Sequence, residues 1–288
     1  MIMKYLTLNN GVEMPQLGLG AAGLWYSKKK VLFSKKTWNQ FRLYSKTIKM
    51  DTFLYDSSGA YGYHQNLLGI INKLYKSRDK MFICTKLGNS EQRTGDVRAA
   101  LQHSLDALET DYVDLYLMHW PQTDTFIDCY LQMEELYKEG KARAIGVCNF
   151  NKHHIEELME RATVVPAVNQ FEIQPLFTQV PLIEYCKSIG IQPMAYSPLG
   201  RMHDVLIKAK PLREISKKYG KNVPQIILRW GIQQGLAVLP RTSKPERVEE
   251  FLDIFNFELT DSEMQAISDL NDNIRLRYNP DKCDFMAL

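Results

Sequence analysis

The chain alternates between short apolar runs and longer segments in which apolar residues recur at helical spacing. The runs have the length of buried strands, and the segments between them have the period of amphipathic helices. The strand candidates are 17–20, 53–55, 81–85, 113–118, 144–147, 167–169, 192–195 and 236–239. The clearest helix candidates are 97–108, 126–137 and 155–159. Because strands alternate with helices, we expect the strands to be parallel.

Several of the predicted helices end at a glycine just before the next strand. Gly140, Gly190 and Gly235 hold these positions, where a residue without a Cβ readily takes the left-handed conformation that ends a helix. The pattern amounts to about eight strand–helix units, which favours a closed (β/α)8 barrel over an open sheet. We therefore predict an α/β fold, a TIM barrel, as one domain over residues 1–288.

The first residues of the chain precede this repeat. Runs 5–8 and 12–14 flank Asn9-Asn10-Gly11, and an Asn-Gly pair supplies the positive φ of a tight hairpin turn. We expect this β-hairpin to close the barrel bottom.

Residues 18–23, Gly-Leu-Gly-Ala-Ala-Gly, match the dinucleotide fingerprint. However, no buried strand precedes them and no acid follows before Asp51, later than the roughly 20 residues expected. We therefore interpret them as a short strand and a glycine-rich loop.

Segment 26–50 has an unusual charge pattern, because it carries bases and no acid. The bases are Lys28, Lys29, Lys30, Lys35, Lys36, Arg42, Lys46 and Lys49. Thr37, Phe41, Tyr44 and Ile48 recur at helical spacing, which predicts an amphipathic helix with a basic outer face. A patch for nucleic acid or an anionic membrane is the alternative. We favour a solvated helix face, because the neighbouring segments do not extend the patch.

The composition is that of an ordinary globular protein, with 45% hydrophobic and 24% charged residues. A net charge of +3 gives no reason to expect a nucleic-acid partner. No apolar run approaches the roughly 20 residues of a membrane helix, and the N-terminus lacks the apolar core of a signal peptide. Five cysteines without a Cys-x-x-Cys pair indicate a reducing, cytoplasmic location.

Polar residues follow the predicted strands at the points where the strands end. They are Asp56, Lys86, His119, Asn149, Gln170, Ser197 and Arg241. Each residue alone has an ordinary structural explanation, such as a turn, a helix cap or a solvated side chain. On a barrel, however, all of them would share the C-terminal edge, where barrel enzymes place their active sites. The shared edge favours one functional site.

The chemistry available to these residues is specific. Tyr61, five positions after Asp56 on a glycine-flanked loop, is by itself too weak an acid at neutral pH, with a reference pKa of about 10. We expect the Lys86 ammonium to lower that pKa and Asp56 to hold Lys86 by an ion pair. His119 would donate a hydrogen bond to a carbonyl oxygen. Such a set suits hydride reduction of an aldehyde or ketone.

Motifs along most of the chain resemble those of the aldo-keto reductases. They are Asp56-x4-Tyr61-Gly62, Thr85-Lys86, 117–121 (Leu-Met-His-Trp-Pro), 140–150 (Gly-Lys-x-Arg-Ala-Ile-Gly-Val-x-Asn-Phe), 168–170 (Val-Asn-Gln), 195–200 (Ala-Tyr-Ser-Pro-Leu-Gly) and Pro240-Arg241-x4-Glu246-Arg247. The resemblance runs from the hairpin to Phe285, with a weak stretch over 26–50. It implies a monomeric TIM barrel that binds NADP(H) across the barrel mouth.

The resemblance also implies roles for residues at matching positions. Tyr61 would be the general acid, with Asp56, Lys86 and His119 completing a catalytic tetrad, and histidine at 119 implies carbonyl rather than carbon–carbon reduction. Asn149 and Gln170 would grip the nicotinamide carboxamide, and Tyr196 would stack on its ring, although a core tyrosine is the alternative. The further cofactor-binding positions are Ser197, Leu199, Arg241, Thr242, Ser243, Arg247 and Glu250.

The last of these positions indicate which cofactor is used. Arg241 stands where the family binds the 2′-phosphate of NADPH, and arginine is bidentate and always charged. We therefore expect NADPH rather than NADH. Ser243 and Glu246 have capping-box spacing ahead of a helix whose N-terminus would face the anion. Arg247 would contact the adenosine.

Three features depart from the family pattern. Cys148 replaces a serine before Asn149, and a thiol is a weak donor. Phe251 stands where an adenine-contacting asparagine is common. Segment 26–50 lacks the usual pattern of the first helix and second strand. The departures leave open a damaged or regulatory member of the family.

The substrate is only partly indicated by the sequence. Trp25 and Trp120 resemble pocket aromatics, with ordinary core packing as the alternative. Short loops and a brief C-terminal tail resemble microbial members, similar to 2,5-diketo-gluconate reductases and prostaglandin F synthase-like enzymes, and suggest an open site for small carbonyl compounds. No metal site is expected. The alternative function is a cofactor-binding but non-catalytic regulator, like the potassium-channel β subunits.

Overall fold

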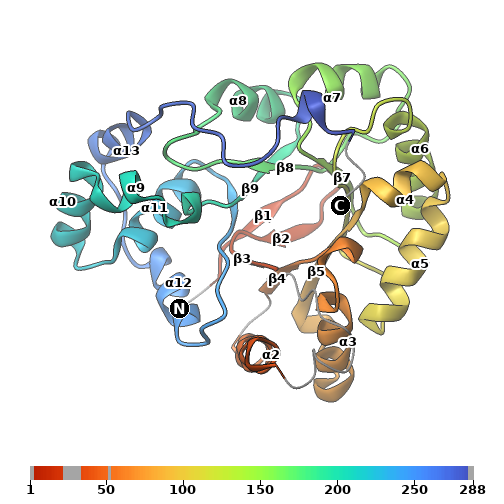
Figure 1. Ribbon diagram of the computed structural model, residues 1–288, viewed down its shortest axis with the longest axis horizontal. Helices are drawn as coiled ribbons and strands as arrows, with labels where there is room; N and C mark the ends of the chain where they lie inside the picture. The colour runs from red at the N-terminus through yellow and green to blue at the C-terminus, as the bar shows by residue number, and fades with distance from the viewer. Residues whose placement is uncertain (1–2, 22–33, 51–52, 285–288) are drawn as a thin grey trace.

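A parallel barrel forms the centre of the molecule (Figure 1). The computed structural model describes residues 3–21, 34–50 and 53–284. The strands are β3 (Gly18–Gly20), β4 (Phe53–Asp56), β5 (Met81–Leu87), β6 (Leu115–Met118), β7 (Ile145–Cys148), β8 (Val168–Glu172), β9 (Gln192–Tyr196) and β10 (Ala237–Leu239). Neighbours in this order pair in parallel. A parallel bridge between Leu17 and Val238 closes the barrel, which confirms the predicted fold.

Amphipathic helices surround the barrel and cover the outer face of the strands (Figure 1). In chain order they are α2 (Lys35–Thr47), α3 (His64–Tyr75), α4 (Asn89–Thr94), α5 (Val97–Leu108), α6 (Phe126–Lys138), α7 (Lys152–Met159), α8 (Val180–Ser188), α9 (Asp204–Lys208), α10 (Lys210–Tyr219), α11 (Val223–Gln233), α12 (Arg247–Leu252) and α13 (Asp261–Ser268). The glycines predicted to stop helices do so, with φ near +74° at Gly140, +76° at Gly190 and +73° at Gly235.

The hydrophobic core has two parts, because each strand is buried on both faces. The larger part lies between strands and helices and includes Tyr55, Leu101 and Phe150. The smaller fills the barrel interior with side chains such as Phe82 and Leu117. A strand buried on both faces appears in the sequence as a continuous apolar run, so the strands could be predicted from the sequence.

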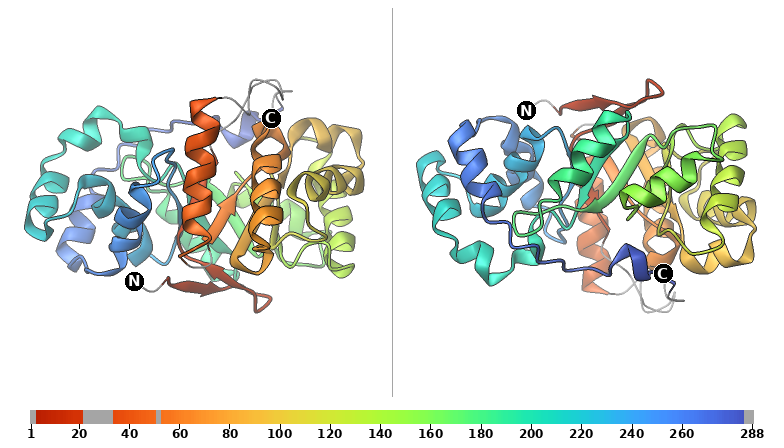
Figure 2. Two further views of the ribbon diagram at one scale, coloured as in Figure 1. Left: turned by 90° about the horizontal axis from the view of Figure 1, so that it is seen from below. Right: turned by 90° about the horizontal axis from the view of Figure 1, so that it is seen from above.

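The N-terminal hairpin seals one end of the barrel. Strands β1 (Tyr5–Thr7) and β2 (Glu13–Pro15) pair in antiparallel fashion, and Leu8 and Met14 join the interior core. Of the Asn-Gly pair, only Gly11 takes a positive φ, at +83°. The Asn10 side chain donates to the Arg143 carbonyl at 2.9 Å. The hairpin lies at the end opposite the C-terminal segment (Figure 2), so the predicted closure of the barrel bottom is confirmed.

The described part of the basic segment, residues 34–50, contains the predicted helix. Helix α2 begins after Ser34, whose hydroxyl accepts from the Thr37 amide at 3.1 Å. Tyr44 and Ile48 are buried, whereas Lys35 and Arg42 are exposed. The inner face of α2 packs on α3 and on β4. Helix α2 therefore occupies the position of the first helix of the barrel.

Residues 271–284, called here the C-terminal strap, cross the open end of the barrel (Figures 1 and 2). The amides of Asp272 and Ile274 donate to the Leu176 carbonyl at 3.2 and 3.0 Å. At the far end, the Asp284 carboxylate accepts from the amide and hydroxyl of Thr123 at 2.9 and 2.7 Å.

Within the described ranges, no helix is long and apolar enough to cross a bilayer.

Candidate active site

The polar residues at the strand ends converge on one cleft of about 1020 Å³ at the open end of the barrel. Predicted site residues that line it are Asp56, Tyr61, His119, Trp120, Asn149, Gln170, Tyr196, Ser197, Leu199, Arg241, Thr242, Ser243, Arg247 and Glu250. Lys86 lies beneath the floor of the cleft, with 1% of its surface exposed. Trp25 falls outside the described residues.

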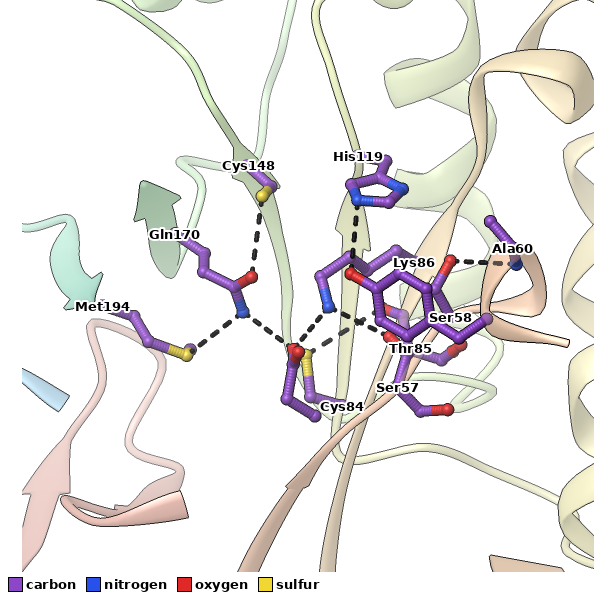
Figure 3. A network of polar contacts seen from close by, with 12 residues as sticks. Ser57, Ser58, Ala60, Cys84, Thr85, Lys86, His119, Cys148, Gln170 and Met194 are labelled. Atoms are coloured by element: carbon purple, nitrogen blue, oxygen red, sulfur yellow. Dashed lines mark hydrogen bonds and ion pairs between the residues drawn. The ribbon is translucent and has the colours of Figure 1, made fainter. Parts of the chain in front are cut away.

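A buried ion pair forms the base of the site. The Lys86 ammonium, near the end of β5, donates to the Asp56 carboxylate at the end of β4 and to the Ser57 carbonyl at 3.0 Å. The same Asp56 oxygen accepts from the Gln170 amide at 2.8 Å. Burial alone disfavours the ammonium, but Asp56 outweighs it and the pKa of Lys86 is raised. Lys86 is therefore a fixed positive charge (Figure 3).

Tyr61 lies on the 3-10 turn η1 (Gly59–Tyr61), which begins at Ser58. Its hydroxyl faces His119 Nε2 at 3.4 Å, and the rings meet edge to face at 5.8 Å. The Lys86 ammonium is 5.2 Å from the centre of the Tyr61 ring. The ammonium donates its hydrogen bonds to Asp56 and Ser57, so it acts on Tyr61 through its charge.

The electrostatics of Tyr61 differ from the sequence-based expectation. Burial raises its pKa to about 12, although the Lys86 charge pulls it downward as predicted. The prediction that Lys86 brings the phenol below its ordinary pKa is therefore wrong for this structure. Desolvation of the phenolate is the larger effect, because a phenolate loses its water shell in the cleft.

His119 is a neutral side chain. Burial, together with the charges of Lys86 and Arg277, holds its pKa well below the ordinary value. Its backbone is fixed on both sides, since the amide donates to the Leu87 carbonyl and the carbonyl accepts from the Asn149 side chain, both at 3.0 Å. Its Nδ1 has no partner among the described residues. A neutral imidazole can donate through Nε2 toward the place that Tyr61 also faces.

Two residues just after strands turn into the cleft through left-handed backbone conformations. Asn149 follows β7 with φ of +64°, and Ser197 follows β9 with φ of +48°. Such conformations cost about 1–3 kcal/mol for residues other than glycine and gather at functional sites. The Tyr196 hydroxyl donates to the Asn149 side chain at 2.7 Å, which joins the two strand ends.

Cys148 lies beside these residues, at the position that departs from the family pattern. Its thiol donates to Gln170 Oε1 at 3.7 Å and accepts from the Asn149 amide at 3.2 Å. Burial raises its pKa, so the thiol stays protonated. Cys148 therefore keeps a weak polar contact with Gln170 (Figure 3) and with Asn149.

Cations gather at the other end of the cleft. They are Lys36, Arg241, Lys244 and Arg247, with Glu250 the acid among them. Burial and the nearby Arg241 charge lower the pKa of Lys36, so the two cations stand close together. Arg241 is exposed and forms no ion pair with the described residues. Repelling cations on one wall indicate a site for an anion.

The predicted capping box is wrong. Helix α12 begins at Arg247 with Glu246 as its N-cap, and no side chain caps it. The turn before it is held instead by Thr242, whose hydroxyl accepts from the Lys244 amide at 3.0 Å. An anion at this end of the cleft would therefore meet cationic side chains rather than the N-terminus of a capped helix.

Among the described residues, one group of possible metal ligands lies away from the cleft, at His153, His154 and Asp281. His154 Nδ1 accepts from the Asn151 amide at 3.1 Å, and His154 Nε2 faces His153 Nε2 at 3.1 Å. An imidazole that accepts at Nδ1 carries its proton on Nε2, where it cannot bind a metal. In this arrangement the group is a hydrogen-bonded cluster.

Sequence reasoning missed four charged residues of the cleft, namely Lys36, Arg201, Lys244 and Arg277. Lys36 belongs to the basic face that was interpreted as solvated, and its position ahead of Thr37 in the helical pattern gave no sign of the cleft. Arg277 belongs to the strap, which has neither helical nor strand periodicity. Its approach to the site depends on contacts with residues more than 100 positions earlier.

Comparisons with known proteins point to one family. The model of the Aldo/keto reductase family matches residues 17–272. A glyoxal reductase of Bacillus subtilis (strain 168) is 39% identical over 279 residues, covering 96% of each chain. The crystal structure of an aldo-keto reductase from a deep-sea metagenome has a TM-score of 0.88 at 34% identity, covering 97% of this chain and 100% of that one. A Bombyx mori aldo-keto reductase in complex with NADP has a TM-score of 0.84 at 30% identity, covering 100% and 99%.

Proposed function

Because the chain belongs to the aldo/keto reductase family and so is an oxidoreductase, we propose that it reduces an aldehyde or ketone to the alcohol with NADPH. The observation that carries the proposal is the arrangement at the catalytic end of the cleft. Tyr61 faces neutral His119 at 3.4 Å, above the buried Lys86–Asp56 pair. A proton donor and a hydrogen-bond donor therefore converge where one carbonyl oxygen would bind.

Tyr61 is the proposed proton donor. Its pKa of about 12 keeps the phenol protonated at neutral pH. During reduction the carbonyl oxygen becomes an alkoxide, a much stronger base than a phenolate, so the proton passes from Tyr61 to that oxygen. The Lys86 charge then stabilises the phenolate left behind until solvent returns a proton. Asp56 keeps Lys86 in place without taking its proton.

His119 is the proposed second contact to the carbonyl oxygen. Because its pKa is well below the ordinary value, the imidazole polarises the carbonyl as a neutral donor and does not compete with Tyr61 as an acid. The fixed backbone of His119 means that little reorganisation is needed as charge develops on the oxygen.

NADPH fits the donor set of the cleft. Asn149 and Gln170 offer side-chain amides for a carboxamide, Tyr196 offers a ring for stacking, and Arg241 with Lys36 offers charge for a phosphate. The structure of a relative in complex with NADP supports the same choice. When bound, NADPH supplies the hydride that the carbonyl carbon receives. Ser197, Leu199, Thr242, Ser243, Arg247 and Glu250 complete the proposed cofactor contacts.

We propose further that the protein works as a monomer in the cytoplasm on a small carbonyl compound. All five cysteines are buried free thiols, which supports a reducing compartment. Trp120, which lines the cleft beside His119, is the proposed aromatic wall of the substrate pocket. Trp25 remains a sequence-based prediction for the same pocket.

The experiment compares NADPH and NADH as reductants for methylglyoxal, glyoxal and 4-nitrobenzaldehyde, in the wild type, Arg241→Met and Arg213→Met. Hydrogen bonds to charged groups contribute about 1.5–3 kcal/mol, so Arg241→Met should raise the KM for NADPH about 10- to 100-fold and leave that for NADH nearly unchanged. Arg213, exposed on α10, is the matched control and should change neither. NADPH binding without reduction of any carbonyl would overturn the proposed activity.

A further inference from the structure

Arg277 of the C-terminal strap is a cation in the cleft near Tyr61 and His119, and the proposed carbonyl reduction does not use it. The strap brings it there by a specific contact. The amides of Leu276 and Arg277 both donate to the carboxylate of Glu172, at 2.9 Å to one oxygen each. Glu172 lies at the end of β8 with 1% of its surface exposed. The backbone of Arg277 is therefore tied to the barrel itself.

The side chain of Arg277 lines the cleft together with Tyr61, His119 and Trp120. Its guanidinium has no carboxylate within ion-pair distance among the described residues. The guanidinium carbon lies 5.5 Å from the centre of the Tyr278 ring, and the centres of the Tyr278 and Trp120 rings are 6.4 Å apart. Glu172 is already occupied by backbone amides, so the strap positions a cation without neutralising it.

The charge of Arg277 reaches the reacting groups. It lowers the pKa of both Tyr61 and His119, and it acts in the same direction on the buried thiol of Cys148. The other charges close to Tyr61 are Lys86 and Asp56, which neutralise each other. The Glu172 carboxylate also acts on Tyr196 in this part of the cleft, but it forms no ion pair with the Arg277 guanidinium. Arg277 is therefore a cation without an ion-pair partner among the described residues, separate from the cations at the far end.

The neighbouring arginine shows that this placement is not a general property of the strap. Arg275, two residues earlier, lies over the ring of Phe177 at 4.6 Å and is absent from the cleft lining. The two arginines share sequence context, charge and partial burial. They differ in whether they face the site, which makes Arg275 a matched control.

We propose that Arg277 binds a carboxylate of the substrate, so that the preferred substrates are aldehydes or ketones that carry a carboxylate group. This inference rests on the proposed carbonyl reduction and narrows its substrate class. A guanidinium binds a carboxylate through two parallel hydrogen bonds. Its single charge matches a carboxylate better than a phosphate dianion, which would leave a negative charge in a cleft whose nearest other cation, Lys86, is already paired.

The test uses two aldehydes of nearly equal size, 4-carboxybenzaldehyde and 4-formylbenzamide, with saturating NADPH. The wild type should show a kcat/KM at least about tenfold higher for the carboxylate, given the usual strength of hydrogen bonds between charged groups. Arg277→Gln should lower kcat/KM for the carboxylate about 10- to 100-fold, mainly through KM, and change that for the amide less than about threefold. Arg277→Lys should retain part of the preference, and Arg275→Gln should retain all of it.

A second measurement is independent of turnover of the charged aldehyde. Benzoate should inhibit reduction of 4-formylbenzamide competitively, more weakly at high salt, and Arg277→Gln should abolish that inhibition. Equal losses for both aldehydes in Arg277→Gln, or unchanged benzoate inhibition, would overturn the role of Arg277 while the reductase function stands. A wild type that reduces neither aldehyde, nor any neutral carbonyl, would overturn the proposed function and this inference with it.

Discussion

At the scale of single residues, burial and charge act on Tyr61 in opposite directions, and burial is the larger effect. The sequence placed Tyr61, Lys86 and His119 together, because their strand ends share one edge. It could not predict the sign of the net pKa shift, which depends on how much water reaches the phenol. A raised pKa suits a proton donor that must remain protonated until a stronger base forms beside it.

A flat pH profile for reduction follows from these pKa shifts. As the proposed acid, Tyr61 would contribute fully below its pKa of about 12 and would lose that contribution only above it. As the proposed neutral donor, His119 would lose its contribution only in acid, below its lowered pKa. We expect kcat for 4-nitrobenzaldehyde to be constant from about pH 6 to pH 9.

The measurement is kcat against pH, with NADPH and with NADPH deuterated at the transferred position. A large isotope effect shows that hydride transfer limits the rate, and a constant one shows that the same step limits it at every pH. His119→Gln should lower kcat and leave the profile flat. A midpoint near neutral pH in the wild type that disappears in His119→Gln would contradict the assignment of His119 as a neutral donor.

At the scale of elements, a buried polar chain fastens α2 to the start of the site. Tyr44 on α2 hydrogen-bonds to His64 Nε2 on α3, and His64 Nδ1 meets the Ser57 hydroxyl at 2.8 Å. Ser57 also accepts from Lys86 through its carbonyl at 3.0 Å. Helix α2, which belongs to the least family-like segment of the sequence, is thus connected to Lys86. The sequence predicted the helix from Thr37, Tyr44 and Ile48 but not this connection, which depends on a histidine 20 residues later.

Acid should weaken the fold through His64. Burial, with the charges of Lys86 and Arg241, lowers its pKa to about 3. Between the ordinary pKa of about 6.5 and that value, the unfolded chain binds a proton that the folded chain does not. The free energy of unfolding should therefore fall with decreasing pH in this window, by up to about 1.4 kcal/mol per pH unit from this residue.

Urea unfolding between pH 4.5 and pH 7 measures this effect. His64→Asn removes the titrating group and should flatten the dependence of the unfolding free energy on pH, at some cost in stability at neutral pH. His103→Asn, an exposed histidine on α5, is the control and should keep the wild-type slope. Equal slopes in all three proteins would contradict the role given to His64.

At the scale of the whole molecule, the hairpin and the strap occupy opposite ends of one barrel (Figure 2). The hairpin fills the N-terminal end with Leu8 and Met14, so the strand ends at the other edge form the cleft. The strap then contributes Arg277 at the catalytic end. The same eight strands therefore enclose the interior core, carry the hairpin at one end and form the cleft at the other.

Most of this architecture was predictable, and the exceptions have physical reasons. The sequence pattern predicts a strand over 113–118, but β6 begins at Leu115 and Val113 forms only an isolated bridge to Ala142. Between them, the Asp114 carboxylate accepts from the Ile83 amide and pairs with Arg78 and Arg143, at 2.8 Å each, which the apolar pattern does not indicate. Strands buried on both faces leave a clear pattern in the sequence. The strap leaves none, because its path is set by single contacts such as Glu172 with the Arg277 amide.

The central claim is that Tyr61 delivers the proton in an NADPH-dependent carbonyl reduction, and Tyr61→Phe tests it most directly. The measurement is NADPH oxidation with methylglyoxal, beside NADPH affinity by fluorescence titration, in the wild type and the variant. Loss of a general acid typically costs 10²–10⁴-fold, so we predict at least about a hundredfold lower kcat with NADPH affinity within about twofold of wild type. A Tyr61→Phe protein that binds NADPH and turns over methylglyoxal at the wild-type rate would contradict the account.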